Sequence, residues 1–287
     1  MRKALYPLAA AIVAMGAVAA PGPASAAGTA PASASAPAQT RQVHVDGYRV
    51  TVDCTGSGGP TVILFSGFGD PHTIWAHIQA SLARHHRVCS YDRLGEGTSS
   101  KPRSTQTLAS NVRLLHEVLA KLHMCGPFVL AGHSIGGDIA ADYARVYLRE
   151  TAGLVLFDAT PPGYMQYVLR LIPASAHGLA KALRAEAVSI ISGKNQERLK
   201  VTGTTWAPPG ALGDLPTDVA EHGQNILAGT GKYDRPLQNR WASGEFSLAG
   251  VSRRSQLTIA TRSGHYIFID QPQLALDVIN AVIAEGR

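Results

Sequence analysis

The 287-residue chain has few cysteines, few charged residues and no internal repeat. The three cysteines have a spacing that matches no zinc site. The basic residues stand singly or in pairs, without a clustered stripe or interleaved aromatic residues. The formal net charge of +6 therefore indicates a solvated surface and excludes nucleic acid as an expected partner. With 45% hydrophobic residues, the chain can bury one sizeable core.

The N-terminal segment lacks a hydrophobic run long enough to span a bilayer. Its apolar stretch, from Leu8 to Ala20, is shorter than the roughly 20 residues that a transmembrane helix needs. Arg2 and Lys3 precede this stretch and a small-residue site follows it, as in a secretory signal peptide. We expect residues 1–26 to be removed, leaving an exported chain with no stable membrane anchor. Residues 27–40, rich in Ala, Pro and Ser, are expected to form a flexible linker.

The three cysteines of an exported chain allow one disulfide and one free thiol. Cys54 and Cys89 lie in short segments that read as neighbouring strands, which favours this pair among the three possible pairings. Cys125 precedes a Gly-Pro turn and is expected to be a small buried residue.

From Gln42 onward, short β-rich runs alternate with helix-length segments. Alternating apolar positions flank Asp46-Gly47, which predicts a β-hairpin. Buried parallel strands are predicted at residues 61–65, 88–91, 128–131, 153–157 and 256–260. Helices are predicted at residues 74–83, 108–122, 139–148 and 274–283. This order predicts an α/β fold, in which a mostly parallel twisted sheet carries helices on both faces. Residues 214–250 show no convincing strand pattern.

One short segment, Gly132-His133-Ser134-Ile135-Gly136, lies between a predicted strand and a predicted helix. In that context a Gly-X-Ser-X-Gly pattern forms a sharp turn that exposes the serine hydroxyl above the sheet. The same turn places the Ile135 N–H at a helix N-terminus, where an anion is favoured. Ser134 is therefore predicted to attack a carbonyl carbon.

Several further segments occur together with this turn and in a fixed order. They are Ser66-Gly67-Phe68-Gly69, YDRLGEGTSS at residues 91–100, GLVLFDA at 153–159 and SGHYIFIDQP at 263–272. In these segments the chain, from about Gln42 to its C-terminus, resembles the α/β-hydrolase superfamily and its secreted actinobacterial-type serine hydrolases. The resemblance implies the α/β-hydrolase fold and a helical cap, expected here at about residues 161–210. Tyr164, Met165, Tyr167 and Leu169 would either line a substrate pocket under that cap or cover the core.

The resemblance also implies roles for particular residues. The Phe68 N–H falls where the family supplies a second oxyanion-hole donor, beside Ile135. The common family loop has His-Gly, whereas this chain has Ser66-Gly67, so the support of the loop is in question. His265 matches the catalytic histidine and is expected to be the base for Ser134.

The third member of the triad is expected to be Asp158. It closes the strand-like run at residues 153–157, and the chain order Ser134, Asp158, His265 matches the order typical of the superfamily. The acid more often follows a seventh strand, which would nominate Asp214, Asp218 or Asp234. Two other aspartates are given structural roles: Asp92 in a turn, and Asp270 as the N-cap of the last helix.

These features together predict a secreted serine hydrolase that cleaves a carboxylic ester, a small-molecule substrate, through an acyl-enzyme on Ser134. They imply no metal and no organic cofactor. Amide hydrolysis and cofactor-free haloperoxidase-like chemistry are alternatives on the same triad, and a binding module of the same fold is a non-catalytic one.

Overall fold

The structure is a computed structural model that describes residues 39–203 and 208–286. The predicted signal peptide, residues 1–26, and nearly all of the predicted linker, residues 27–40, lie outside the described residues. Within the described ranges, no helix has both the length and the apolar character needed to cross a membrane.

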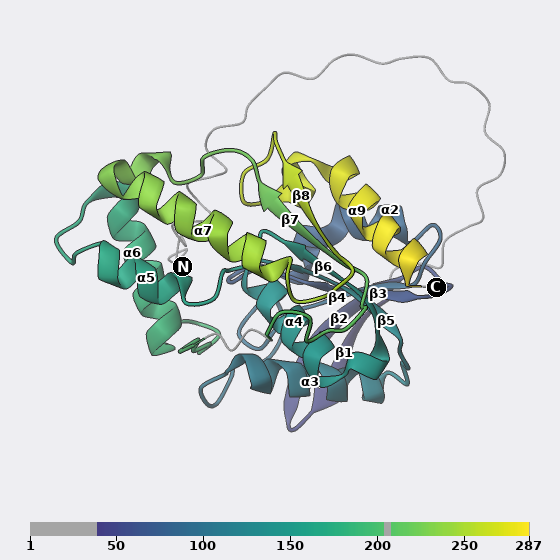
Figure 1. Cartoon of the computed structure of the whole chain (residues 1–287). Coiled ribbons are helices and arrows are strands. Elements are labelled where there is room, and N and C mark those ends of the chain that lie inside the picture. Colours follow the sequence, from purple (N-terminus) through teal and green to yellow (C-terminus); the bar gives the residue numbers. More distant parts are fainter. Residues whose placement is uncertain (1–38, 204–207, 287) are drawn as a thin grey trace, which may run out of the picture.

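Eight strands of the described chain form one sheet in the order β1-β2-β4-β3-β5-β6-β7-β8 (Figure 1). The strands are β1 (Gln39–Val45), β2 (Tyr48–Thr55), β3 (Thr61–Phe65), β4 (Val88–Tyr91), β5 (Phe128–His133), β6 (Thr151–Phe157), β7 (Thr217–His222) and β8 (Ser255–Ala260). β2 pairs antiparallel with β1 and β4, and all the other pairs are parallel. The predicted α/β fold with a mostly parallel sheet is confirmed.

The β1-β2 hairpin shows how turn chemistry fixes a register. Asp46 and Gly47 both have positive φ angles, 51° and 74°. A two-residue turn of this kind matches the twist of the flanking strands, and Asp-Gly adopts it readily. Val45 therefore pairs with Tyr48, as the sequence predicts.

Helices cover both faces of the sheet (Figure 1). The α-helices are α2 (Ala76–Leu82), α3 (Leu108–Lys121), α4 (Ile135–Val146), α5 (Tyr164–Leu171), α6 (Gly178–Ser192), α7 (Asp234–Leu248), α8 (Ile267–Asp270) and α9 (Pro272–Glu285). Short 3₁₀ helices are η2 (His72–Trp75), η3 (Leu148–Glu150) and η4 (Ala228–Tyr233). α3 and α4 lie on one face, and α2 and α9 lie on the other.

Successive side chains of a strand point to opposite faces of the sheet, so the core divides into two clusters, one on each face. In β3, Ile63 and Phe65 pack with the helices on the α3-α4 side, whereas Val62 and Leu64 pack with α2, α8 and α9. Both faces of the central strands are buried, so these strands read as continuous apolar runs.

Between β6 and β7 the chain forms α5 and α6, inside the predicted cap range of residues 161–210. Residues 204–207 of that range lie outside the described residues. Tyr164 and Met165 are buried in the core on the α3-α4 side of the sheet, and Tyr167 and Leu169 pack partly buried against it.

The prediction that residues 214–250 contain no strand is wrong, because β7 occupies Thr217–His222. Asp218, Glu221 and His222 interrupt its apolar pattern, although the whole strand is buried. Neighbouring strands supply polar partners: Oγ1 of Thr258 on β8 donates to Oδ2 of Asp218 at 3.0 Å. A buried polar group is tolerated when it is hydrogen-bonded. This buried strand therefore contains polar residues and lacks the continuous apolar run by which buried strands are predicted.

The antiparallel pairing of β2 and β4 places Cys54 opposite Cys89, and a disulfide joins them as predicted. The prediction for Cys125 is wrong, because this thiol is exposed. Its neighbour Met124 occupies the buried position at the end of α3 instead.

Candidate active site

Ser134 sits at the corner between β5 and α4. Its backbone has φ 52° and ψ −127°, a strained conformation that carries the chain from the strand directly into the helix. The corner also requires glycine nearby: a Cβ on Gly136 would lie 2.3 Å from the carbonyl oxygen of Ser66. The loop after β3 is therefore packed against the first turn of α4, as the proposed oxyanion hole requires.

The Ser134 hydroxyl lies 3.4 Å from Oγ1 of Thr160, two residues beyond Asp158. Among the described residues, no hydrogen bond joins this hydroxyl to the His265 ring. Such bonds are often long or poorly aligned without substrate and tighten when it binds.

Asp158 and His265 are in direct contact. Nδ1 of His265 lies 2.6 Å from Oδ2 of Asp158, and both side chains are buried. Burial alone would raise the pKa of Asp158, but the facing histidines His222 and His265 outweigh burial and hold the pKa well below its usual range. The carboxylate is therefore ionised, and it holds the His265 proton on Nδ1. Nε2 of His265 is then free to accept a proton.

A second histidine, His222, contacts the same carboxylate and was not identified from the sequence. Its Nδ1 lies 2.7 Å from Oδ1 of Asp158, which also accepts a hydrogen bond from Nε1 of Trp241 at 2.9 Å. The amide Nε2 of Gln238 donates to Nε2 of His222 at 2.7 Å. Both ring nitrogens of His222 are thus engaged, so it is not placed to receive a proton from Ser134. His222 is the last residue of β7, and a prediction of this strand would have placed it near Asp158. The sequence pattern did not reveal the strand.

The alternative acids lie elsewhere. Asp214 pairs with Arg253 on the surface, Asp218 contacts Thr258, and Asp234 accepts from Asn225. Of the four candidates, Asp158 is the one that the structure places against His265.

Another histidine, His133, lies beneath the site. Its Nε2 donates to the carbonyl oxygen of His265 at 2.9 Å. Burial and the neighbouring His265 lower the pKa of His133 well below its ordinary value, so its ring is neutral. This ring supports the loop that carries His265.

The loop before His265 is fixed by Asp270, whose Oδ2 accepts hydrogen bonds from the Gly264 N–H at 2.8 Å and from Oγ of Ser263 at 3.2 Å. The predicted role of Asp270 as the N-cap of the last helix is wrong: Gln271 holds that position, with no side-chain cap bond. Asp92 does have the predicted structural role, since its Oδ1 accepts from the His72 N–H at 2.7 Å and its Oδ2 from the Thr98 N–H at 2.9 Å.

The loop carrying Phe68 lies over the serine corner. A Cβ on Gly67 would fall 2.7 Å from Nδ1 of His133, so only glycine fits at this close approach. Arg93 donates to the carbonyl oxygens of Ser66 and Gly67, and these bonds supply the support that the change from His-Gly to Ser66-Gly67 called into question. No group of three or more His, Cys, Asp or Glu side chains in the described part of the chain is arranged to hold a metal ion.

Comparisons with known proteins show the family and the fold of this chain. A sequence model described as "Alpha/beta hydrolase family" matches residues 62–278. The uncharacterized protein Rv2715 of Mycobacterium tuberculosis is 28% identical over 274 residues, which cover 84% of this chain and 79% of the relative.

Two solved structures share the fold. A serine hydrolase involved in carbazole degradation, the CarC enzyme, has 18% identity and a TM-score of 0.62, covering 86% of this chain and 99% of its own. The carboxylesterase CesB of Bacillus subtilis has 14% identity and a TM-score of 0.61, covering 88% of this chain and 93% of its own. With most of its length matched by the family's sequence pattern and fold, this chain belongs to the alpha/beta hydrolase family.

Proposed function

We propose that this hydrolase is a serine esterase in which Ser134 is the nucleophile, His265 the base and Asp158 the orienting acid. The observation that carries the proposal is the 2.6 Å contact between His265 and Asp158, made beside a serine on a strand-to-helix corner. That the carboxylesterase CesB has the same fold supports an ester as the substrate class.

In the proposed reaction, Oγ of Ser134 attacks the acyl carbon of the ester while Nε2 of His265 accepts the hydroxyl proton. The N–H groups of Phe68 and Ile135 stabilise the negative oxygen that forms. His265 then gives its proton to the leaving alcohol. A water molecule, deprotonated by His265, hydrolyses the acyl-enzyme and restores Ser134.

Fluorophosphonate labelling combined with an ester panel of varied acyl length tests this function. We expect the parent chain to be labelled at Ser134 and to hydrolyse esters, and Ser134→Ala to lose both properties while remaining folded. Ser81→Ala is the matched control, because this serine lies on α2 on the opposite face of the sheet. Ester turnover by Ser134→Ala, or a parent chain that is not labelled, would contradict the proposal.

We also propose that the chain is exported. The predicted signal peptide at residues 1–26 and the Cys54–Cys89 disulfide support this, since disulfides persist in oxidising compartments. Mass analysis of the protein from the culture medium should give a chain that begins near Ala27. A full-length chain retained inside the cell would contradict export.

A further inference from the structure

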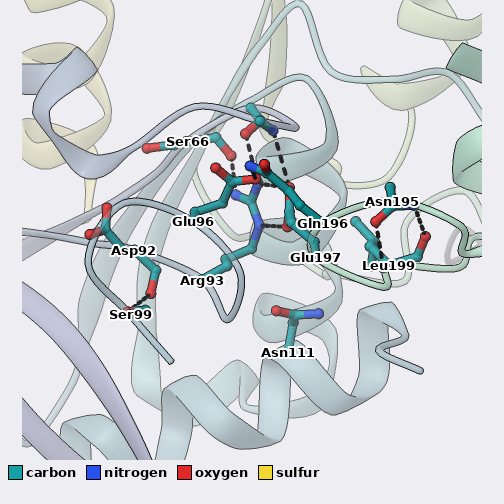
Figure 2. A network of polar contacts seen from close by, with 12 residues as sticks. Ser66, Asp92, Arg93, Glu96, Ser99, Asn111, Asn195, Gln196, Glu197 and Leu199 are labelled. Atoms are coloured by element: carbon teal, nitrogen blue, oxygen red, sulfur yellow. Dashed lines mark hydrogen bonds and ion pairs between the residues drawn. The ribbon is translucent and has the colours of Figure 1, made fainter. Parts of the chain in front are cut away.

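A buried ion pair connects the insertion between β6 and β7 to the loop of the proposed oxyanion hole (Figure 2). Arg93 follows β4, and Glu197 lies in the chain after α6. Nε of Arg93 donates to Oε2 of Glu197 at 2.7 Å, and Nη2 donates to Oε1 at 2.9 Å. Both side chains are 2% exposed.

The same two side chains hold the Phe68 loop from two sides. Arg93 donates from Nη1 to the carbonyl oxygen of Ser66 at 2.5 Å and from Nη2 to that of Gly67 at 2.7 Å. Oε1 of Glu197 accepts from the Gly69 N–H at 3.1 Å. The planar guanidinium offers five donors in a fixed fork, which suits it to bind a carboxylate and two carbonyls together.

The contact with Gly67 has a direct consequence for Phe68. The carbonyl of Gly67 and the N–H of Phe68 belong to one planar trans peptide, so they point in opposite directions. Fixing the carbonyl on Arg93 therefore fixes the direction of the Phe68 N–H. This N–H is the proposed second donor of the oxyanion hole.

Glu197 is itself held in place by its neighbours. The side chain of Asn195 bonds both the N–H and the carbonyl of Leu199, each at 2.9 Å, and closes the turn around Glu197. Nε2 of Gln196 donates to Oε1 of Glu96 at 2.8 Å. Burial, reinforced by the neighbouring Glu197 carboxyl group, raises the pKa of Glu96 to about 8.

Stability alone does not account for such a pair. Removing two charges from water costs free energy that their attraction often fails to recover, and apolar replacement of a buried pair is often neutral or stabilising. A role in orientation accounts for the two bonds that Arg93 makes to the loop carbonyls in addition to its ion pair.

We propose that Arg93, anchored by Glu197, is a positioning residue that orients the Phe68 N–H toward the oxyanion, so that the insertion between β6 and β7 sets the geometry of the oxyanion hole. This inference rests on the proposed esterase function. It makes the insertion part of the catalytic geometry, in addition to any role in covering the substrate.

The test uses the mature chain with two sets of changes. Glu197→Gln keeps the shape of the side chain but places an NH₂ group against a donor of Arg93. The double variant R93M/E197M removes both charges and is expected to fold, because no charge is left buried and unpaired. Arg184→Lys is the control: this arginine, also in the insertion, donates to the carbonyls of Leu169 and Ile172 and does not contact the Phe68 loop.

We expect kcat to fall by about 10-fold to 100-fold in both test variants, since loss of a whole oxyanion donor costs about 100-fold to 1,000-fold. KM should change less than about threefold, because the orientation matters mainly in the transition state. The inhibition constant of phenylboronic acid, which forms a tetrahedral adduct with a serine hydroxyl, should rise by a factor similar to the loss in kcat. Arg184→Lys should leave all three values near those of the parent.

Parental kcat in folded R93M/E197M or Glu197→Gln would overturn the inference, and so would an equal loss in Arg184→Lys. Failure of both test variants to fold would assign the pair to the fold and overturn it as well. A parent chain that is neither labelled by fluorophosphonate nor active on esters would instead contradict the proposed function. The parent chain is therefore assayed before the variants.

Discussion

Replacing Asp158 by asparagine tests the candidate site sharply, because an amide cannot serve both sides of this carboxylate. Oδ1 accepts hydrogen bonds from Nδ1 of His222 at 2.7 Å, from Nε1 of Trp241 at 2.9 Å and from the His222 N–H at 3.3 Å. Only an oxygen can accept these three bonds, so the amide must turn its carbonyl toward them. Its NH₂ group then replaces Oδ2, which lies 2.6 Å from Nδ1 of His265.

The consequence is a change of tautomer in His265. Facing an NH₂ group, Nδ1 must become an acceptor, and the ring proton moves to Nε2. That nitrogen can then no longer take the proton of Ser134. We expect kcat to fall by about 10,000-fold, the loss seen when a triad carboxylate becomes an amide and the histidine adopts the wrong tautomer. Because three of the four bonds survive, the free energy of unfolding should fall by only about 1–2 kcal/mol.

The assay compares kcat on a short-chain ester with thermal unfolding of the same samples. Asp218→Asn is the matched control: this aspartate is also buried, and burial raises its pKa to about 6, so a neutral amide fits its place beside Thr258. Its kcat should stay within about threefold of the parent value. Near-parental kcat in Asp158→Asn, or a collapse in the Asp214, Asp218 or Asp234 counterpart, would refute the assignment of the acid.

Three further predictions concern stability and the second histidine. Burial, with the nearby carboxylates, raises the pKa of Glu245 well above its ordinary value of 4.5. The folded chain therefore holds a proton that the unfolded chain releases, and the parent loses stability as the pH rises above 4.5. Glu245→Gln should therefore be more stable than the parent by about 1 kcal/mol or more at pH 8 in urea unfolding, and a gain that shrinks as the pH rises would refute this. His222→Leu should lower kcat only about tenfold, because one hydrogen bond to the acid is lost. A loss as large as that of the asparagine variant would refute this secondary role of His222. Cys54→Ser/Cys89→Ser should lower the free energy of unfolding by about 3 kcal/mol, and an unchanged urea midpoint would contradict a stabilising disulfide.

The sequence by itself determined the features that depend on neighbours along the chain. Asp46-Gly47 defines a turn because both residues tolerate positive φ angles. Gly132 and Gly136 permit the serine corner for a different reason, since a Cβ on either would clash with nearby backbone atoms. The apolar runs of β3, β5 and β6 predicted a buried parallel sheet, because a strand covered on both faces needs no polar positions. The pairing of Cys54 with Cys89 followed from the same pattern of strands.

Only the tertiary structure decided which polar groups meet at the carboxyl ends of the parallel strands. β7 was not predicted because it buries the polar residues Asp218 and His222, whose partners Thr258 and Asp158 lie elsewhere in the chain, where a local pattern does not reveal them. His222 contacts an acid 64 positions away, and Glu197 binds an arginine 104 positions away. Such contacts depend on strand order and side-chain direction rather than on local propensity. The contact of Asp158 with His265 and the bonds from Arg93 to the Phe68 loop therefore depend on the tertiary structure.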